Sequence, residues 1–349
     1  MASTQKIKVG VIGASGYTGA DLIRLALAHP AISIEVLAAK THAGKPMGDV
    51  FPHLGPYGLP DLVDSDDVAW DALDAVFCGL PHGTAHQIIS RLPDALKVID
   101  MSADFRLRDA EVYRTTYGLT HEATDLMPSA VYGLTEHYRE SIAGTRLVAC
   151  PGCYPTATLM ALLPLVGAGQ VDESDLVVDA KSGVSGAGRA LKQNTLFTEA
   201  GEGLSPYAVG THRHAPEIEQ EVSRAAGKDV TVNFTPHLIP MSRGELVTCY
   251  VRLANGATPD DLRATLMARY DDEPFVHVMA AGTVPATQNV RGSNHCHISV
   301  FADRIADRAI VIATLDNLVK GSAGQALQNF NLMCGLDETS GLTQVALFP

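Results

Sequence analysis

The chain has 349 residues with a formal net charge of −13; 46% of the residues are hydrophobic and 19% are charged. This length favours two domains over a single core, and the acidic balance argues against a general nucleic-acid or membrane-surface binder. The apolar runs are too short to cross a bilayer, and six cysteines without a dense framework spacing fit a reducing compartment. We therefore expect a cytoplasmic protein that binds anionic ligands with individual arginines and helix N-termini.

The first predicted element is a buried strand at residues 7–12, followed by a glycine-rich turn and a helical run from residue 20. Glycines at such a turn let the backbone approach a pyrophosphate, whose charge is met by the helix N-terminus. The spacing is G-x-x-G-x-x-G rather than the more familiar G-x-G-x-x-G, and an ordinary tight turn is the alternative. The favoured interpretation is a dinucleotide site formed by Gly13, Ser15, Gly16, Tyr17, Thr18 and Gly19.

The end of the second predicted strand, at residues 32–38, indicates which dinucleotide binds. A free ribose 2′-hydroxyl usually meets an acidic residue there, whereas a 2′-phosphate calls for basic or hydroxyl groups. The residues that follow this strand include Lys40 and Thr41. The sequence therefore predicts NADP rather than NAD, although surface lysines are common in loops.

Two further strands, at residues 74–81 and 96–100, alternate with helical segments. This alternation predicts an α/β fold with a Rossmann-type, doubly wound parallel sheet, which binds ligands at the carboxyl ends of its strands. Leu80 and Pro81 are then expected near the nicotinamide, and the candidate substrate-binding residues here are Ser102 and Arg106. A surface ion pair explains Arg106 equally well.

Cys153 is distinctive because of its surroundings. A β-prone stretch enters a Pro-Gly turn at residues 151–152 and an apolar helical run follows, which predicts that Cys153 lies at the first turn of a helix. Backbone N–H groups and the helix dipole stabilise a thiolate there, lower the thiol pKa and favour a nucleophilic role. A small buried side chain is the structural alternative.

Cys150 and Cys153 also form a C-x-x-C pair, which is compatible with a redox disulfide or with half of a zinc site. The other four cysteines are scattered singly, so a four-thiolate site would need ligands from distant strands. His82 and His86, four residues apart, have no third histidine or carboxylate near them in the sequence. We therefore predict no metal, and a dithiol function is the weaker hypothesis.

Two segments of the second half carry further candidate site residues. Residues 181–188, which include Ser182 and Gly183, form a second glycine-serine loop whose backbone is suited to a cofactor or a phosphate; a flexible connection is the alternative. The segment His212-Arg-His-Ala-Pro-Glu217 opens a helix. His214 is our first choice for the base, oriented by Glu217 three residues on, and His212 is then expected to face substrate or phosphate. The sequence alone does not separate the roles of the two histidines.

The later strands are predicted at residues 230–235, 245–252, 295–301 and 309–313. Their alternation predicts an α+β second domain with a largely antiparallel sheet. Arg243, in a loop between two of them, either binds a carboxylate or phosphate or makes a structural ion pair. The segment after residue 314, which contains Asn317, is helix-like, and its glycines permit close approach to a backbone or a cofactor.

These elements divide the chain into two domains. We predict an NADP-binding domain at residues 1–149, completed by a C-terminal helix at residues 315–349, and a catalytic and oligomerisation domain at residues 150–314.

Six blocks of this sequence carry a family resemblance, namely residues 13–19, 102–107, 148–156, 182–188, 212–217 and 316–321. With these blocks the chain resembles the longer form of the N-acetyl-gamma-glutamyl-phosphate reductases of arginine biosynthesis, in the aspartate-semialdehyde dehydrogenase-like superfamily. The resemblance spans nearly the whole chain, and the block around Cys153 is highly specific.

The resemblance implies a reaction and an assembly. Cys153 attacks the acyl phosphate of N-acetyl-L-glutamyl 5-phosphate, and NADPH reduces the resulting thioester to N-acetyl-L-glutamate 5-semialdehyde. A cytoplasmic homodimer or homotetramer is implied as well. The alternatives are aspartate-semialdehyde dehydrogenase, a reductase of carrier-bound aminoadipyl phosphate, and a catalytically silent NADP-binding regulator.

Overall fold

The computed structural model describes residues 6–349, which form two compact units. The first unit runs up to Pro151 and also includes Ser322–Thr343. The second unit comprises Gly152–Gly321 and Gln344–Pro349. The chain passes from the first unit to the second between Pro151 and Gly152, one residue before Cys153.

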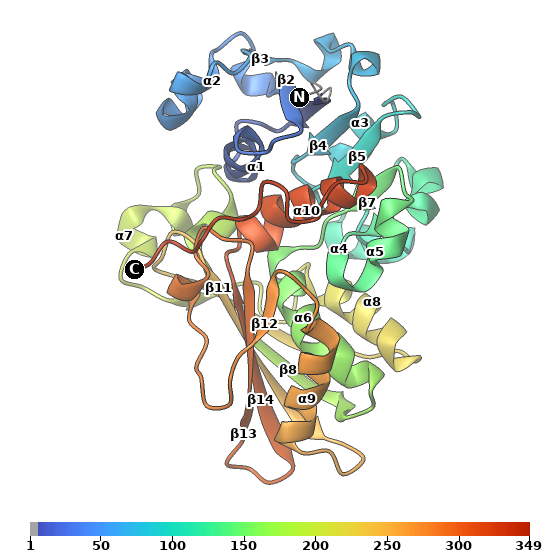
Figure 1. The fold of residues 1–349 in the computed structure, drawn as a ribbon, viewed down its shortest axis with the longest axis vertical. Coiled ribbons are helices and arrows are strands. Elements are labelled where there is room, and N and C mark those ends of the chain that lie inside the picture. The colour runs from blue at the N-terminus through green and yellow to red at the C-terminus, as the bar shows by residue number, and fades with distance from the viewer. Residues whose placement is uncertain (1–5) are drawn as a thin grey trace. The chain divides into compact units, whose positions relative to one another are not determined.

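The first unit contains a parallel sheet of seven strands (Figure 1). Every strand pairing in it is parallel. The strand order is β3 (Leu62–Val63), β2 (Ile32–Ala38), β1 (Ile7–Ile12), β4 (Ala75–Cys78), β5 (Lys97–Asp100), β7 (Leu147–Ala149) and β6 (Val131–Tyr132). The order reverses between β1 and β4, which is where a doubly wound sheet binds its ligand. The predicted Rossmann-type sheet is confirmed.

The helices of the first unit, apart from the C-terminal α10, connect these strands. They are α1 (Tyr17–Leu27), α2 (Met47–Val50), α3 (Ala85–Ile89), α4 (Ala110–Tyr117), α5 (Thr135–Ala143) and α10 (Gly324–Met333). The central strand β4 is buried along its whole length, and its side chains pack with those of α3, β5 and the β5–α4 loop in one apolar core that includes Val76, Ile89, Val98 and Phe105. Such continuous apolar strands form because helices or loops cover both faces of a parallel sheet.

The C-terminal helix is shorter than the predicted helix at 315–349. Residue 315 still belongs to strand β14 (Arg308–Leu315), and a π-helical turn at Val319–Ala323 leads into α10. Asp316 interrupts the pattern because its Oδ1 atom accepts hydrogen bonds from the backbone N–H groups of Leu318 and Val319, at 2.9 and 3.2 Å. Gly335, with a φ of 65°, lies two residues beyond the end of α10. A left-handed residue at this position is a common way to end a helix.

The second unit contains a mixed sheet of seven strands. The strand order is β12 (Val276–Val278), β13 (Cys296–Ala302), β14, β11 (Glu245–Leu253), β8 (Val171–Gly183), β10 (Asn233–Ile239) and β9 (Ser205–Pro206). The pairings β12·β13 and β8·β10 are parallel and the others are antiparallel. The prediction of a largely antiparallel sheet is therefore confirmed.

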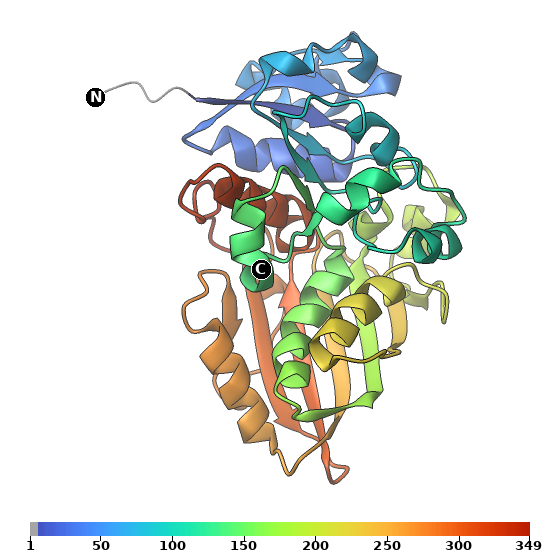
Figure 2. The same ribbon diagram turned by 90° about the vertical axis from the view of Figure 1, so that its right-hand side faces the viewer.

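Three helices of the second unit, α6 (Cys153–Gly167), α8 (Ala215–Ala226) and α9 (Pro259–Tyr270), pack together beside this sheet; the fourth, α7 (Phe197–Ala200), is a single turn. Figure 2 shows the three helices in front of the strands, with α6 in green between α8 in yellow and α9 in orange. Helix α6 is apolar on all sides, and nearly all of its residues from Tyr154 to Val166 are buried. A helix of this kind is stable only inside a core, and its burial fixes the position of its first residue.

Candidate active site

Cys153 is the first residue of α6, so its predicted position at a helix N-terminus is confirmed. Gly152 is the N-cap, in an extended conformation, and the Cys153 side chain is half-buried. Gly321 lies against it: a Cβ atom added to Gly321 would be 2.8 Å from the Cβ of Cys153. Real Cβ atoms do not approach so closely, and position 321 therefore requires a glycine.

Glu217 holds the residue that precedes Cys153. It lies in the first turn of α8 and is fully buried, and its Oε1 atom accepts a hydrogen bond of 2.8 Å from the backbone N–H of Gly152. The prediction from sequence also assigned Glu217 to the orientation of His214, and that role stays a prediction. The contact with Gly152 fixes the entry of the chain into α6.

His212 and His214 lie together around Tyr154. The ring of Tyr154 is 5.8 Å from the ring centre of each histidine, and the two histidine rings are 4.8 Å apart. The backbone N–H of His214 donates to Nδ1 of His212 at 3.1 Å. Burial, with a smaller effect of Arg213, lowers the pKa of His212 to about 4. At neutral pH His212 is therefore an uncharged imidazole, and electrostatic attraction of phosphate falls to other groups.

Glu245, which the prediction from sequence did not include, lies beside Cys153. It is the first residue of β11 and is fully buried. Burial raises the pKa of Glu245 to about 8, while the Cys153 side chain, within hydrogen-bonding reach, opposes the rise and Asp316 adds to it. The available signal was a glutamate at the start of a strand whose alternate residues Val247, Cys249 and Val251 are apolar. A carboxyl group in such a strand is expected to be buried only with a specific role.

Arg243 and Asn317 belong to one corner of the second unit. Nη1 of Arg243 is 3.3 Å from Oδ2 of Asp316, which is the ion pair considered as an alternative for this arginine. Asn317 accepts a hydrogen bond from the backbone N–H of Gly244 at 2.8 Å and donates to Oγ of Ser185 at 3.0 Å.

The loop of Ser182 and Gly183 closes the same corner. The backbone N–H of Gly183 donates to Gly244 O at 2.9 Å, and a Cβ atom added to Gly183 would be 2.9 Å from the backbone of Arg243. Ser182 is buried, and its hydroxyl donates to Gly183 O at 3.2 Å. The structure thus joins the 181–188 loop, Arg243 and Asn317, which the sequence pattern presented as separate segments.

The glycine turn of the first unit has the shape of a nucleotide-binding turn. Gly13 has a φ of 83°, and a Cβ atom on Gly19 would lie 2.5 Å from Gly13 O. Gly16 is the N-cap of α1, which starts at Tyr17 and includes Thr18 in its first turn. Side chains are thus excluded at two of the three glycines, and the space they leave in front of a helix N-terminus fits a pyrophosphate group.

Lys40 and Thr41 lie at the same edge of the sheet as this turn. Both are exposed residues of a 3₁₀ turn that directly follows β2. The last residue of β2, Ala38, accepts hydrogen bonds from the backbone N–H groups of Gly13 and Ala14, at 2.9 and 3.1 Å. The glycine turn and the end of β2 are therefore adjacent.

Leu80 and Pro81 follow β4 in a loop that Asp104 holds. Asp104 is fully buried and accepts hydrogen bonds from the N–H groups of Gly83 and Ala85, at 2.7 and 2.9 Å. It also accepts from the N–H of His86 and from the hydroxyl of Tyr113, at 3.1 and 2.8 Å. Pro81 is exposed and Leu80 is partly buried, so the loop presents both to ligands.

The other two candidate substrate-binding residues of the first unit are buried. The Ser102 hydroxyl donates to Asp100 at 2.9 Å, and Nε of Arg106 donates to Cys150 O at 2.8 Å. Burial raises the pKa of Asp100 to about 7, against the effect of the Ser102 hydrogen bonds. Arg106 is only 9% exposed and is no surface ion pair.

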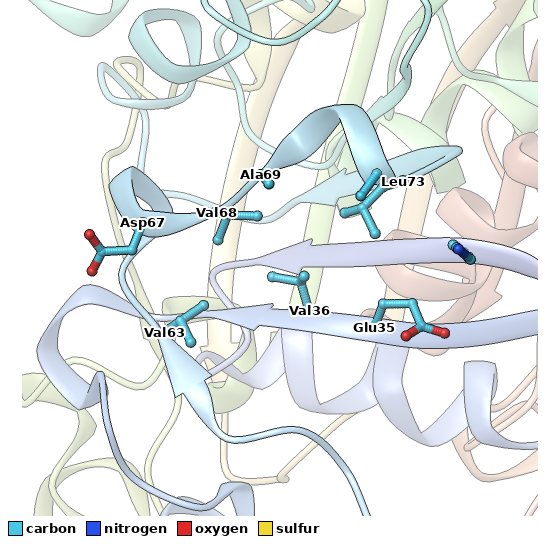
Figure 3. Close-up of a pocket in the computed structure, with 9 residues that line it drawn as sticks. Glu35, Val36, Val63, Asp67, Val68, Ala69 and Leu73 are labelled. Carbon is cyan, nitrogen blue, oxygen red and sulfur yellow. The ribbon is translucent and has the colours of Figure 1, made fainter.

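A pocket of about 340 Å³ lies elsewhere in the first unit. The pocket is lined by Lys8, Glu35, Val36, Val63, Asp67, Val68, Ala69, Ala72 and Leu73, most of which are labelled in Figure 3. None of the predicted site residues is among its lining residues. The pocket is mainly apolar, and it shares no lining residue with the glycine turn.

Among residues 6–349, no group of three or more His, Cys, Asp or Glu side chains is arranged to hold a metal ion. No helix in the same range combines the length and the apolar character that a membrane crossing requires.

Comparison with known families gives two domain matches. The NAD-binding domain of the semialdehyde dehydrogenases matches residues 8–145, and the dimerisation domain of the semialdehyde dehydrogenases matches residues 153–317.

Curated relatives match nearly the full chain. A probable chloroplastic N-acetyl-gamma-glutamyl-phosphate reductase from Arabidopsis thaliana is 53% identical over 98% of this chain and 86% of its own length. The N-acetyl-gamma-glutamyl-phosphate reductases of Afipia carboxidovorans and Ruegeria pomeroyi are 52% and 53% identical, each over 98% of this chain and 99% of their own.

Solved structures share the fold at low sequence identity. Aspartate semialdehyde dehydrogenase II of Vibrio cholerae has a TM-score of 0.71 at 16% identity, covering 95% of this chain and 99% of its own. The enzyme from Candida albicans, solved with NADP, has a TM-score of 0.66 at 18% identity and the same coverage.

Proposed function

Because the chain belongs to the N-acetyl-gamma-glutamyl-phosphate reductase family, we propose that it reduces N-acetyl-L-glutamyl 5-phosphate with NADPH in arginine biosynthesis. One acyl phosphate, one NADPH and one proton give N-acetyl-L-glutamate 5-semialdehyde, NADP⁺ and inorganic phosphate. The observation that carries the proposal is Cys153 at the N-terminus of a buried helix, within a chain about half identical to these reductases over nearly its full length.

Cys153 is the proposed nucleophile. Its sulfur attacks the carbonyl carbon of the acyl phosphate, the C–O bond to phosphate breaks, and a thioester remains on the protein. The oxyanion of this step is stabilised by backbone N–H groups at the start of α6, where one donor is worth about 3 kcal/mol. Glu217 keeps this helix start in place through its hydrogen bond to Gly152.

His214 is the proposed base that manages the proton transfers of the reaction, including delivery of the proton gained by the departing phosphate. His212, uncharged at neutral pH, lies beside it and offers a hydrogen-bonding imidazole to the substrate. Arg243 is the proposed partner of a substrate carboxylate or phosphate, because its guanidinium group can bind such an anion at two points and about a quarter of its side chain is exposed. Ser102 and Arg106 hydrogen-bond at the ends of β5 and β7, and we propose that the substrate binds near them.

The glycine turn, Lys40 and Thr41 are the proposed holders of NADPH. Gly13, Gly16 and Gly19 face the pyrophosphate with Ser15, Tyr17 and Thr18, and Lys40 with Thr41 meets the 2′-phosphate. Leu80 and Pro81, with Ser182, Gly183 and Asn317 of the second unit, are proposed to bind its nicotinamide half. Once bound, NADPH supplies the hydride that converts the thioester into the aldehyde oxidation level.

The oligomeric state and the cellular compartment are also proposed, from general features of the chain. The match of residues 153–317 to a dimerisation domain supports a homodimer or homotetramer. Six free cysteines support a reducing compartment such as the cytoplasm. The substrate and inorganic phosphate are the proposed small-molecule partners, and the net charge of −13 gives no support to nucleic-acid or membrane binding.

The test runs the reaction in reverse with N-acetyl-L-glutamate 5-semialdehyde, phosphate and NADP⁺, and follows NADPH by absorbance. We expect phosphate-dependent turnover, and Cys153→Ser is expected to lower it at least about 10³-fold because the sulfur is the attacking atom.

The same assay separates the alternatives. Faster turnover of aspartate semialdehyde would reassign the substrate. NADPH binding without turnover of any semialdehyde would favour the silent regulator. Cys153→Ser must still bind NADPH with unchanged affinity, which shows that the loss is chemical and not a loss of folding.

A further inference from the structure

Asp104 is a fully buried carboxylate that binds an exposed loop of the first unit. The loop follows β4, and most of residues 81–84 are exposed. Oδ1 of Asp104 accepts a hydrogen bond of 2.7 Å from the backbone N–H of Gly83, and Oδ2 accepts from the N–H groups of Ala85 and His86, at 2.9 and 3.1 Å. Backbone groups of a surface loop are ordinarily solvated, so their attachment to an interior carboxylate is a specific feature of this segment.

Two buried side chains complete the set of donors around Asp104. The Tyr113 hydroxyl donates to Oδ1 at 2.8 Å, and Nδ1 of His86 is 3.2 Å from Oδ2. A buried carboxylate is costly unless such hydrogen bonds satisfy it, and those it accepts are about twice as strong as bonds between neutral groups. The position therefore requires a group that only accepts, because an amide would turn its own N–H groups toward these donors.

Capping of helix α3 accounts for only part of this arrangement. The bonds from Ala85 and His86 satisfy N–H groups of the first helical turn, which have no partner within a helix. Gly83 lies before the helix and has a φ of 81°, a conformation that strains residues other than glycine. Its bond to Oδ1 of Asp104 contributes nothing to the helix and fixes the loop itself.

The same loop begins at the glycine turn. The backbone N–H of Gly79 donates to Ile12 O at 2.8 Å, and a Cβ atom on Gly13 would lie 2.3 Å from Gly79 O. These contacts place the end of β4 against the proposed pyrophosphate site, where the strand order reverses. Leu80 and Pro81 follow Gly79 directly, so the loop that carries them starts at the proposed nucleotide site.

Asp104 is itself held by the end of the neighbouring strand β5. Its backbone N–H donates to Oγ of Ser102 at 3.2 Å, and the Ser102 hydroxyl donates to Asp100, the last residue of β5, at 2.9 Å. Strand β5 pairs directly with β4. The sheet therefore fixes the loop at two points, at Gly79 through β4 and at Gly83 through β5 and Asp104.

We propose that Asp104 is a positioning residue for the nicotinamide half of the dinucleotide. It has no exposed surface, so it acts through the loop of residues 79–83 and not by contact with the ligand. It holds Leu80 and Pro81 in their binding conformation before the ligand arrives, and this lowers the entropic cost of ordering the loop on binding. The inference rests on the proposed function, which assigns Leu80 and Pro81 to this half of NADPH.

The experiment compares the affinities of NADPH and of 2′,5′-ADP, which lacks the nicotinamide half, by isothermal titration calorimetry. In Asp104→Asn the amide oxygen can still face Ala85 and His86, but the amide nitrogen then faces the N–H of Gly83. We expect the Kd of NADPH to rise about tenfold because this buried donor loses its acceptor, while the Kd of 2′,5′-ADP stays at the wild-type value.

Tyr113→Phe is the matched control. It removes one buried hydrogen bond from the same carboxylate but leaves the bonds to Gly83, Ala85 and His86 in place. Both ligands should therefore bind Tyr113→Phe as they bind the wild type. A loss of NADPH affinity in Tyr113→Phe as large as in Asp104→Asn would contradict the role of the loop bonds.

The other outcomes are distinct. Equal weakening of both ligands in folded Asp104→Asn means a general structural role and overturns the inference, and so does unchanged affinity for NADPH. If Asp104→Asn does not fold, Gly83→Val breaks the same contact from the loop side, because a β-branched residue is strained at a φ of 81°. It should show the same selective loss, and unchanged NADPH affinity in Gly83→Val overturns the inference.

The binding measurement needs no acyl phosphate or semialdehyde. A selective loss of NADPH affinity in a protein that turns over no semialdehyde would support the role of Asp104 and reject the proposed reaction. Phosphate-dependent turnover by the wild type, together with equal losses of both ligands in Asp104→Asn, would reject the role of Asp104 and leave the proposed reaction in place.

Discussion

At the scale of single residues, the cofactor preference depends on Lys40, which is exposed directly after β2. Lys40→Glu exchanges attraction of a 2′-phosphate for repulsion, and we expect the Kd of NADPH to rise about tenfold, equivalent to 1.4 kcal/mol, with little change for NADH. Fluorescence titration of both nucleotides measures this. Lys6→Glu, at the opposite end of β1, changes the net charge equally and should leave both affinities unaltered. An equal loss of affinity for NADPH and NADH would show that Lys40 does not recognise the 2′-phosphate.

The role of a residue could be predicted where neighbouring residues in the sequence determine its position. The position of Cys153 follows from a turn and an apolar run that are adjacent in the sequence. Glu245 and Cys153 are 92 positions apart in the sequence. No local sequence pattern could therefore predict that they interact. Arg106 was predicted equally as a pocket residue and as a surface ion pair, whereas the structure buries it, and two of its hydrogen bonds go to the carbonyl groups of Cys150 and Met101.

At the scale of elements, the turn between β1 and α1 is limited by packing around Gly19. In Gly19→Ala the new Cβ atom would meet Gly13 O at 2.5 Å. We expect a loss of about 1–3 kcal/mol in stability together with loss of nucleotide binding. Gly16→Ala is the matched control, since its Cβ atom would be 3.5 Å from the nearest atom and its φ is −86°. Thermal unfolding should separate the two variants; equal melting temperatures would contradict the steric argument.

Elements of the first unit were predictable because alternating apolar strands and helical runs have distinct periods. The C-terminal helix was predicted too long for a physical reason. Composition after residue 314 favours a helix, but the Asp316 side chain competes for the N–H groups of the first turn and delays the helix. Past Gly335 the chain leaves the helical conformation.

At the scale of the whole molecule, each unit contains a fully buried acid whose pKa is raised by its burial. Asp100 in the first unit has its pKa raised to about 7, and Glu245 in the second has its pKa raised to about 8, in both cases chiefly by burial. Because the folded pKa is the higher one, each acid stabilises its unit fully at low pH, and this stabilisation is lost as pH rises through the folded pKa. Buried histidines act in the opposite direction: His29, His121, His212, His277, His295 and His297 have lowered pKa values from burial.

The two effects separate above about pH 7.5, where about nine tenths of the unfolded chain's imidazoles are neutral, as are those of the folded chain. Between about pH 7.5 and 8.5 we therefore expect the free energy of unfolding to fall, by up to about 1.4 kcal/mol per pH unit for each acid still protonated. Glu245→Gln should flatten this decline, and Asp100→Asn should change it less, because Asp100, with a pKa of about 7, has mostly ionised by then. Urea unfolding at several pH values measures the slopes, and each variant serves as the control for the unit that carries the other. Parallel slopes in wild type and both variants would mean that neither acid is held neutral by the fold.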